Sequence, residues 1–189
     1  MTTTEQDSHA LARRALEHFQ ARTTDQAPAI MRQSLSAYRD PARYAREVDR
    51  VFRSHPVAVC LSLELPQPGS FVTLDMFGTP LLAVRGSDGV ARVFLNVCRH
   101  RGARLCSTER GTARVFACPY HAWTYDQQGA LIGRYRGETF GAVDSDQLGL
   151  TALASAERAG IVWATLTPGL PCDIDTWLGD MAPLLERLR

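Results

Sequence analysis

The chain contains no lysine, and all 21 of its basic residues are arginine. Because 20 residues are acidic, the formal net charge is only +1 at pH 7. A protein that binds nucleic acid or an anionic membrane surface through bulk charge needs a clear excess of one sign. The composition therefore predicts neither nucleic acid nor a membrane as a partner.

Long apolar runs are also missing. No stretch approaches the roughly 18 apolar residues of a membrane-spanning helix, and the amino terminus, Met1–Asp7, has no basic segment followed by an apolar one. The five cysteines are an odd number in a chain without an export signal, which argues against a disulfide framework. Cys60 lies in an apolar run and is expected in the core, and Cys106 is expected to be structural. We therefore expect a cytoplasmic protein.

The ends of the chain have helical patterns. Residues 1–54 are predicted to be helical, with Asp40-Pro41 as a cap followed by a proline at the first helical position. Residues 168–189 return to a helix with apolar residues on one side. That apolar side consists of Ile174, Trp177, Leu178, Met181, Leu184, Leu185 and Leu188. An apolar stripe of this kind is expected to pack against something beyond itself.

Residues 55–167, between these ends, have a different pattern. Short apolar runs alternate with turn signals, which predicts an antiparallel β domain. The segment Ser87–Gly89, between the apolar runs Leu81–Arg85 and Val90–Val97, predicts a hairpin.

Two mixed pairs of metal-ligating residues stand out in this β domain. The first is Cys98-x-His100 and the second is Cys118-x-x-His121. In a Rieske [2Fe-2S] centre two histidines replace two cysteines on one of the two irons, so each loop gives a thiolate to one iron and an imidazole to the other. Gaps of one or two residues allow neighbouring side chains to reach adjacent metals. The four residues are therefore predicted to bind one [2Fe-2S] cluster per chain.

A structural zinc site is the alternative interpretation of the same four residues. Zinc also accepts two cysteines and two histidines, but its usual spacing pairs cysteine with cysteine and histidine with histidine. Here each pair mixes the two types. Gly102, after the first pair, permits backbone conformations that other residues resist.

These motifs resemble a known family. The segments Asn96–Cys106, Phe116–Asp126 and Gly129–Leu131 are similar to the amino-terminal part of ring-hydroxylating oxygenase alpha subunits. The resemblance runs from about residue 40 to the carboxyl end and is most specific over residues 94–131. It implies a mainly β fold, in which a Rieske-type antiparallel β domain with its iron–sulfur loops at one tip is flanked by amino- and carboxyl-terminal helices.

Some positions depart from the family pattern or bear on the redox potential. Ala122 stands where the family usually has glycine, and His55-Pro56 where a tryptophan is common. High-potential Rieske proteins resemble one another in placing a serine two residues after the second histidine, where this chain has Trp123, whereas a tyrosine four residues after it is kept as Tyr125. We therefore predict a low-potential cluster, towards the negative end of about −150 to +300 mV.

The family's chemistry needs a second metal. An oxygenase alpha subunit passes the electron to a mononuclear Fe(II) held by two histidines and a carboxylate. No histidine follows His121, and the other three, His9, His18 and His55, precede the cluster loops. We therefore expect no catalytic residue in this chain and interpret it as the electron-transfer part of an oxygenase, in which residues 168–189 resemble the start of the missing catalytic domain. The resemblance implies an oxidoreductase, a mono- or dioxygenase component for aromatic or similar small organic substrates.

The resemblance also implies partners. These are a reductase or ferredoxin that donates electrons, an oxygenase catalytic domain or subunit, and a homotrimer in the full-length form. Five arginines near the loops are candidates for docking an acidic donor, or are simply solvated charges. They are Arg99, Arg101, Arg104, Arg134 and Arg136. Two other functions remain open, a free-standing Rieske ferredoxin and a zinc-stabilised binding module.

Overall fold

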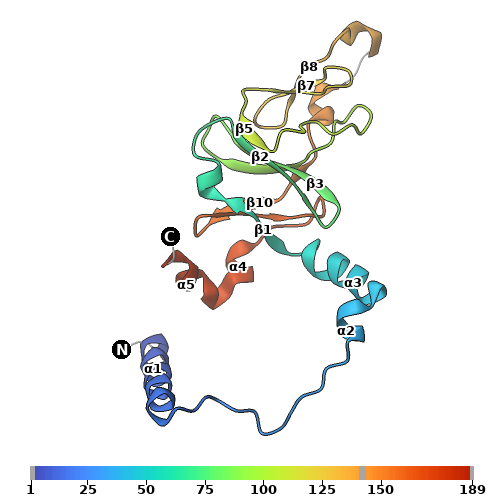
Figure 1. The fold of residues 1–189 in the computed structure, drawn as a ribbon. Helices are drawn as coiled ribbons and strands as arrows, with labels where there is room; N and C mark the ends of the chain where they lie inside the picture. Colours follow the sequence, from blue (N-terminus) through green and yellow to red (C-terminus); the bar gives the residue numbers. More distant parts are fainter. Residues whose placement is uncertain (1–2, 141–143, 188–189) are drawn as a thin grey trace. The chain divides into compact units, whose positions relative to one another are not determined.

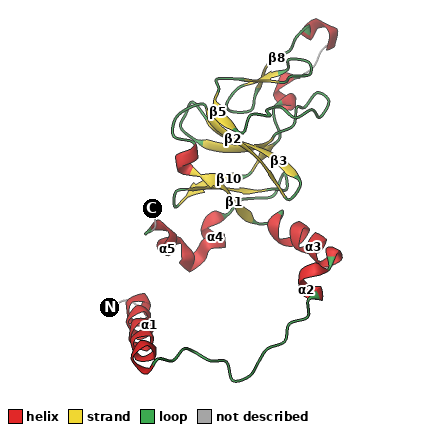
Figure 2. Ribbon diagram, in the orientation of Figure 1, coloured by secondary structure: helices red, strands yellow, loops and turns green. Residues whose placement is uncertain are grey.

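The structure is a computed structural model that describes residues 3–140 and 144–187. The chain forms two compact units, Met1–Asp40 and Pro41–Arg189. Figure 2 shows that, among the described residues, helices occur in both units and strands occur only in the second. Within the described ranges, no helix is both long enough and apolar enough to cross a bilayer.

The described residues of the first unit form the helices α1 (Thr3–Ala21) and α2 (Ser36–Arg39). Residues 22–35 between them have no regular secondary structure, so the prediction of helix throughout residues 1–54 is wrong for this stretch. Helix α1 ends because Arg22 adopts a left-handed conformation with φ of 50°. Three large apolar side chains of α1 are exposed among its described residues, namely Leu11, Leu16 and Phe19.

The second unit begins with helix α3 (Pro41–Glu47) and the π-helical turn η1 (Val48–Phe52). The predicted start at Asp40-Pro41 is confirmed, because α3 begins at the proline. Two contacts join the residues at the end of the π-helical turn to the β domain. The ring of Phe52 stacks on Phe77 with centroids 4.4 Å apart, and Arg53 Nη2 donates to the Phe77 carbonyl at 2.7 Å.

The described residues of the β domain form three antiparallel sheets, drawn in Figure 1. A five-stranded sheet has the order β5-β2-β3-β4-β9, and two three-stranded sheets have the orders β1-β11-β10 and β6-β7-β8. The strands are β1 (Pro56–Leu61), β2 (Ser70–Met76), β3 (Thr79–Arg85), β4 (Ala91–Leu95), β5 (Arg110–Thr112), β6 (Phe116–Ala117), β7 (Thr124–Tyr125), β8 (Leu131–Gly133), β9 (Ala152–Leu153), β10 (Ser155–Arg158) and β11 (Ile161–Thr165). The short 3-10 helices of this region are η2 (Ser62–Glu64), η3 (Gly137–Phe140) and η4 (Ser145–Leu148). The predicted antiparallel β architecture is confirmed.

The predicted hairpin is also confirmed. Strands β3 and β4 pair antiparallel, with Arg85 opposite Ala91. At the turn Gly89 has φ of 79°, a conformation that glycine adopts without strain. The Asp88 carboxylate accepts a hydrogen bond from Val90 N–H at 3.1 Å. The strands differ from the predicted runs by a few residues at their ends.

Strand β3 divides the core into two apolar clusters. Because side chains alternate along a strand, Leu81 and Ala83 enter the first cluster and Leu82 and Val84 enter the second. All four are fully buried. The first cluster comprises Val59, Cys60, Leu65, Val72, Leu81, Ala83, Ala91, Val93, Leu153, Val162, Ala164 and Leu166. The second comprises Phe71, Leu82, Val84, Phe94, Cys98, Leu105, Phe116, Cys118, Trp123, Tyr125, Leu131 and Leu150.

The carboxyl-terminal segment is helical but interrupted. Helix α4 (Ile174–Leu178) is followed by the 3-10 turn η5 (Gly179–Met181) and helix α5 (Ala182–Glu186). The single predicted helix is therefore wrong in detail, since Gly179 has φ of 48° and ends α4. Of the predicted stripe, Ile174 is buried, whereas Trp177, Met181 and Leu184 are exposed. Leu188 lies outside the described residues.

Candidate metal centre

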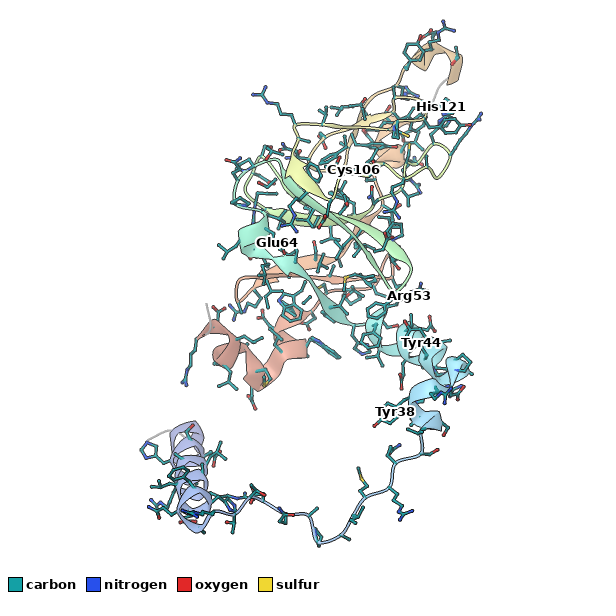
Figure 3. The ribbon with its side chains drawn as sticks, in the orientation of Figure 1. Tyr38, Tyr44, Arg53, Glu64, Cys106 and His121 are labelled. Atoms are coloured by element: carbon teal, nitrogen blue, oxygen red, sulfur yellow. The ribbon has the colours of Figure 1, made fainter. Side chains whose placement is uncertain are left out.

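The two predicted ligand loops have the same backbone geometry. In the first loop Cys98 N–H donates to the Ala103 carbonyl at 2.8 Å, and Gly102 N–H donates to the Cys98 carbonyl at 3.0 Å. Each loop is thus a tight turn that begins at its cysteine and is closed by two backbone hydrogen bonds. Figure 3 shows His121, from the second loop, at the end of the second unit where β7 and β8 lie in Figure 1.

The second loop repeats this pattern at its own cysteine. Cys118 N–H donates to the Trp123 carbonyl at 2.8 Å, and Ala122 N–H donates to the Cys118 carbonyl at 2.9 Å. The fifth residue of each turn is left-handed, with φ of 71° at Gly102 and 54° at Ala122. Glycine adopts this conformation freely, but alanine is strained in it. The expected effect of alanine at this position is thus local strain, while the turn itself keeps its hydrogen bonds.

Both thiols lie in the second core cluster. Cys98 is 1% exposed and Cys118 is 4% exposed. Burial raises the pKa of the Cys98 thiol, the Tyr125 hydroxyl lowers it, and the neighbouring Cys118 adds to the rise. Two buried sulfurs side by side, shielded from water, form a site that suits soft metal ligation.

A tyrosine hydroxyl connects the first loop to the first sulfur. Arg99 N–H donates to the Tyr125 hydroxyl oxygen at 3.1 Å, and this oxygen lies 3.4 Å from Cys98 Sγ. Tyr125 is fully buried, and burial raises the pKa of its phenol well above the usual value. The phenol therefore keeps its proton and can donate it in a hydrogen bond to the sulfur. Tyr125 therefore does more than fill space in the loop, because its hydroxyl contacts both the first loop's backbone and the sulfur of Cys98.

The two imidazoles also form a pair. The rings of His100 and His121 are 4.8 Å apart and nearly perpendicular, at 68°. His100 stacks on Trp123 at 4.8 Å and 8°, and Tyr120 lies against His121 at 3.8 Å. Burial lowers the pKa of His100, and His121 and Arg101 lower it further, which favours the neutral imidazole that binds metals.

The four predicted ligands therefore come together as a thiol pair and an imidazole pair. Nδ1 of His121 is buried and has no hydrogen-bond partner within the described ranges, so a ligand atom is left over for a metal. In the same ranges no three histidine, cysteine, aspartate or glutamate side chains surround a single ion position. A [2Fe-2S] cluster takes only two protein ligands on each iron, and the arrangement fits such a group.

The arginines near the loops differ from one another. Arg99 and Arg101 are exposed, but Arg104 Nη2 bonds both carboxylate oxygens of Asp75, at 3.0 and 3.1 Å. Arg104 is therefore neutralised within the chain and adds little to a basic rim. Arg136 lies 5.5 Å from the Tyr135 ring centroid.

The remaining histidines and cysteines have other surroundings. His18 bonds the side chains of Thr23 and Asp25 at the end of α1, at 2.9 and 2.8 Å, and His9 is exposed. Cys60 belongs to the first core cluster, as predicted. One further residue near the first loop was not indicated by the sequence motifs, namely Asn96, whose side chain bonds the backbone of Cys106. The sequence feature that could have indicated it is a polar residue directly after the apolar strand β4.

Comparison with known proteins identifies the β domain. A family model described as "Rieske [2Fe-2S] domain" matches residues 55–139. The glycine betaine monooxygenase oxygenase subunit of Chromohalobacter salexigens is 35% identical over 146 residues, which is 76% of this chain and 32% of the relative. The chlorobenzene dioxygenase subunit alpha of a Cupriavidus species is also 35% identical, over 76% of this chain and 32% of its own length.

Solved structures give the same result. The apo form of a quaternary ammonium Rieske monooxygenase, CntA, matches with a TM-score of 0.74 and 29% identity, over 80% of this chain and 44% of that one. Naphthalene 1,2-dioxygenase with bound indole matches with a TM-score of 0.70 and 30% identity, over 77% of this chain and 33% of that one. The chain spans about a third of the length of the curated relatives that it matches.

Proposed function

Residues 55–139 of this chain are a Rieske [2Fe-2S] domain, and on this basis we propose that it transfers single electrons through a cluster bound by Cys98, His100, Cys118 and His121. When bound, the cluster supplies one-electron transfer at a higher potential than an all-cysteine centre. The observation that carries the proposal is the convergence of two buried thiols and two imidazoles on two matched turns, with Nδ1 of His121 left without a partner in the described part of the chain.

The chain's own residues prepare this site. Burial in the second core cluster keeps water from the two sulfurs, and the Tyr125 hydroxyl lies 3.4 Å from Cys98 Sγ, where it can donate a hydrogen bond to a cysteine thiolate. The stack of His100 on Trp123 holds one imidazole in place. The loops therefore need little rearrangement on binding, which reduces the cost of binding.

We further propose that the chain acts as the electron-transfer part of a Rieske oxygenase, an oxidoreductase. It would accept electrons from a reductase or ferredoxin and pass them to a mononuclear Fe(II) in a catalytic domain or subunit. Residues 122–189 contain no histidine, so the histidines of that iron site would come from outside this stretch. Alpha-subunit trimers and a cytoplasmic location belong to the same proposal.

The substrate class stays broad in this proposal. The relatives act, by their names, on glycine betaine in one case and chlorobenzene in the other, at equal identity to this chain. We propose aromatic or similar small organic substrates, hydroxylated with O₂.

One observation favours an oxygenase component over a free-standing Rieske ferredoxin. The similarity to the glycine betaine monooxygenase subunit covers 146 residues and thus extends well beyond residues 55–139 into the flanking segments. A small electron carrier would need the β domain alone. A structural zinc site, in turn, usually pairs cysteine with cysteine and histidine with histidine, whereas each pair in this chain mixes the two types.

Metal and sulfide analysis of the anaerobically purified chain tests the proposal. We expect two irons and two sulfides per chain and a Rieske-type EPR signal after dithionite reduction. Cys98→Ala should abolish the signal. Cys106→Ala is the matched control, because this half-buried cysteine lies near the first loop but is not a proposed ligand; it should keep the signal. One zinc per chain with no EPR signal would refute the proposal.

A further inference from the structure

The buried side-chain amide of Asn96, which is not one of the four proposed ligands, forms hydrogen bonds within the first ligand loop. Asn96 is fully buried and lies between β4 and Cys98. Its Nδ2 donates to the Cys106 carbonyl at 2.7 Å, and its Oδ1 accepts from Cys106 N–H at 2.9 Å. The side chain therefore satisfies both backbone groups of Cys106, as a residue on a neighbouring strand would. Cys106, labelled in Figure 3, marks the outgoing arm of the loop.

The backbone of Asn96 holds the same two arms. Its N–H donates to the Pro80 carbonyl at 2.9 Å, which joins it to β3, and its carbonyl accepts from Leu105 N–H at 3.3 Å. Leu105 is buried in the second core cluster. One residue thus connects the sheet, the incoming arm of the loop and the outgoing arm.

The rest of the loop is built on this base. Val97 and Arg104 form an isolated antiparallel bridge directly above it, and Cys98 N–H then donates to the Ala103 carbonyl at 2.8 Å. Each pair fixes the register of the next one. A shift of one residue at the base would displace Cys98 and the histidine that follows it.

We propose that Asn96 is a positioning residue for the cluster, whose buried amide sets the register of the first ligand loop and so the placement of Cys98 and His100. This inference rests on the proposed function. Replacing Asn96 by alanine leaves the N–H and C=O of half-buried Cys106 without their partners, a loss that a buried site does not easily recover from water. Aspartate keeps the size and the acceptor but loses the Nδ2 donor and directs a charge at a carbonyl.

The test compares Asn96→Ala and Asn96→Asp with the control Gln127→Ala in the iron-loaded chain. Gln127 is 8% exposed and its Nε2 donates to the Ala113 carbonyl at 2.9 Å, so the control loses a buried amide bond outside the ligand loops. We expect iron release to a chelator to be faster by about tenfold or more in Asn96→Ala, consistent with the loss of buried hydrogen bonds. Asn96→Asp should show a smaller acceleration and a shifted EPR spectrum. Gln127→Ala should lower the thermal midpoint but keep the iron-release rate and the spectrum.

Amide hydrogen exchange supplies a readout that does not depend on the metal. The N–H groups of Cys98 and Leu105 should lose protection by about tenfold or more in both Asn96 variants and not in the control. Unchanged iron release, spectrum and exchange in both variants would overturn the positioning role. If Asn96→Ala fails to fold, Asn96→Asp decides by the same readouts. If the wild-type chain holds zinc, the proposed function fails, while exchange still decides whether Asn96 sets the loop.

Discussion

Exchanging glycine and alanine at the left-handed position of the two ligand loops should change the stability of the protein in opposite directions. Ala122, with φ of 54°, occupies the position that glycine has in the first loop. Holding a non-glycine residue there costs about 1–2 kcal/mol, whereas the greater freedom of glycine in the unfolded chain offsets roughly 0.5–1 kcal/mol. Ala122→Gly should therefore raise the free energy of unfolding by about 0.5–1 kcal/mol, or the thermal midpoint by about 1–4 °C.

Gly102→Ala is the matched reverse change. A Cβ placed on Gly102 would meet no heavy atom within 4 Å, so the variant adds backbone strain without a steric clash. Its thermal midpoint should fall by a similar amount. The double variant should return close to wild type, because the two changes act in opposite directions at equivalent positions. The remaining difference in midpoint measures the coupling between the two loops, whose imidazole rings lie 4.8 Å apart.

Differential scanning calorimetry of the iron-loaded variants at one scan rate measures these shifts. A fixed scan rate matters because a protein with a bound cofactor does not unfold as a simple two-state system. A midpoint that falls in Ala122→Gly, or that stays unchanged in Gly102→Ala, would contradict the assignment of strain to the second loop. Iron content should stay the same in all variants, since neither side chain is a proposed ligand.

Three further predictions concern potential, pH and docking. Tyr125→Phe removes the hydrogen bond to the sulfur of Cys98, a bond that should strengthen as the cluster gains negative charge. The midpoint potential should therefore fall, by about 40 mV for about 1 kcal/mol of lost differential stabilisation, and a redox titration measures this shift. In the same titration, a wild-type midpoint above roughly +150 mV would contradict a low-potential cluster. Burial raises the pKa of the Cys60 thiol from 9.0 to about 11. Because the thiol stays protonated to a higher pH in the folded state than in the unfolded state, the free energy of unfolding should fall as the pH rises from about 9 to 11. In denaturant titrations across this range Cys60→Ala should lose part of that fall, and an unchanged slope would disprove the effect. The rate of electron transfer from the donor should fall with rising ionic strength. The substitutions Arg99→Gln and Arg101→Gln should weaken this salt dependence more than Arg104→Gln, because the Arg104 side chain is already paired with Asp75. Equal effects of all three substitutions in stopped-flow kinetics would argue against steering by the loop arginines.

Local patterns account for what the sequence alone determined. The ligand types and their spacing, Cys98-x-His100 and Cys118-x-x-His121, predicted the Rieske domain that the family comparison identifies. The hairpin at Ser87–Gly89 and the helix that begins at Pro41 were also predicted. Each of these features depends on residues next to one another in the chain, where turn chemistry, proline geometry and ligand reach act directly.

Local patterns failed where distant parts of the chain or a single backbone angle decided the outcome. The carboxyl-terminal stripe predicted one helix, but Gly179 adopts a left-handed conformation and splits it. Residues 22–35 lie inside a stretch predicted as helix and have no regular secondary structure. Arg104, one of the five candidate docking arginines, forms an ion pair with Asp75 on β2, and the sequence pattern did not indicate this pairing.

The tertiary structure alone decided the environment of the proposed ligands. Burial of the two sulfurs, the hydroxyl of Tyr125 beside Cys98, and the amide of Asn96 against Cys106 all join residues that are separated along the chain. The sequence determines which atoms can bind a metal, because that is a property of residue type and short spacing. How dry the site is, how its protons are held and which register its loops keep depend on packing, because solvent exclusion and hydrogen bonds between distant segments exist only in the folded chain.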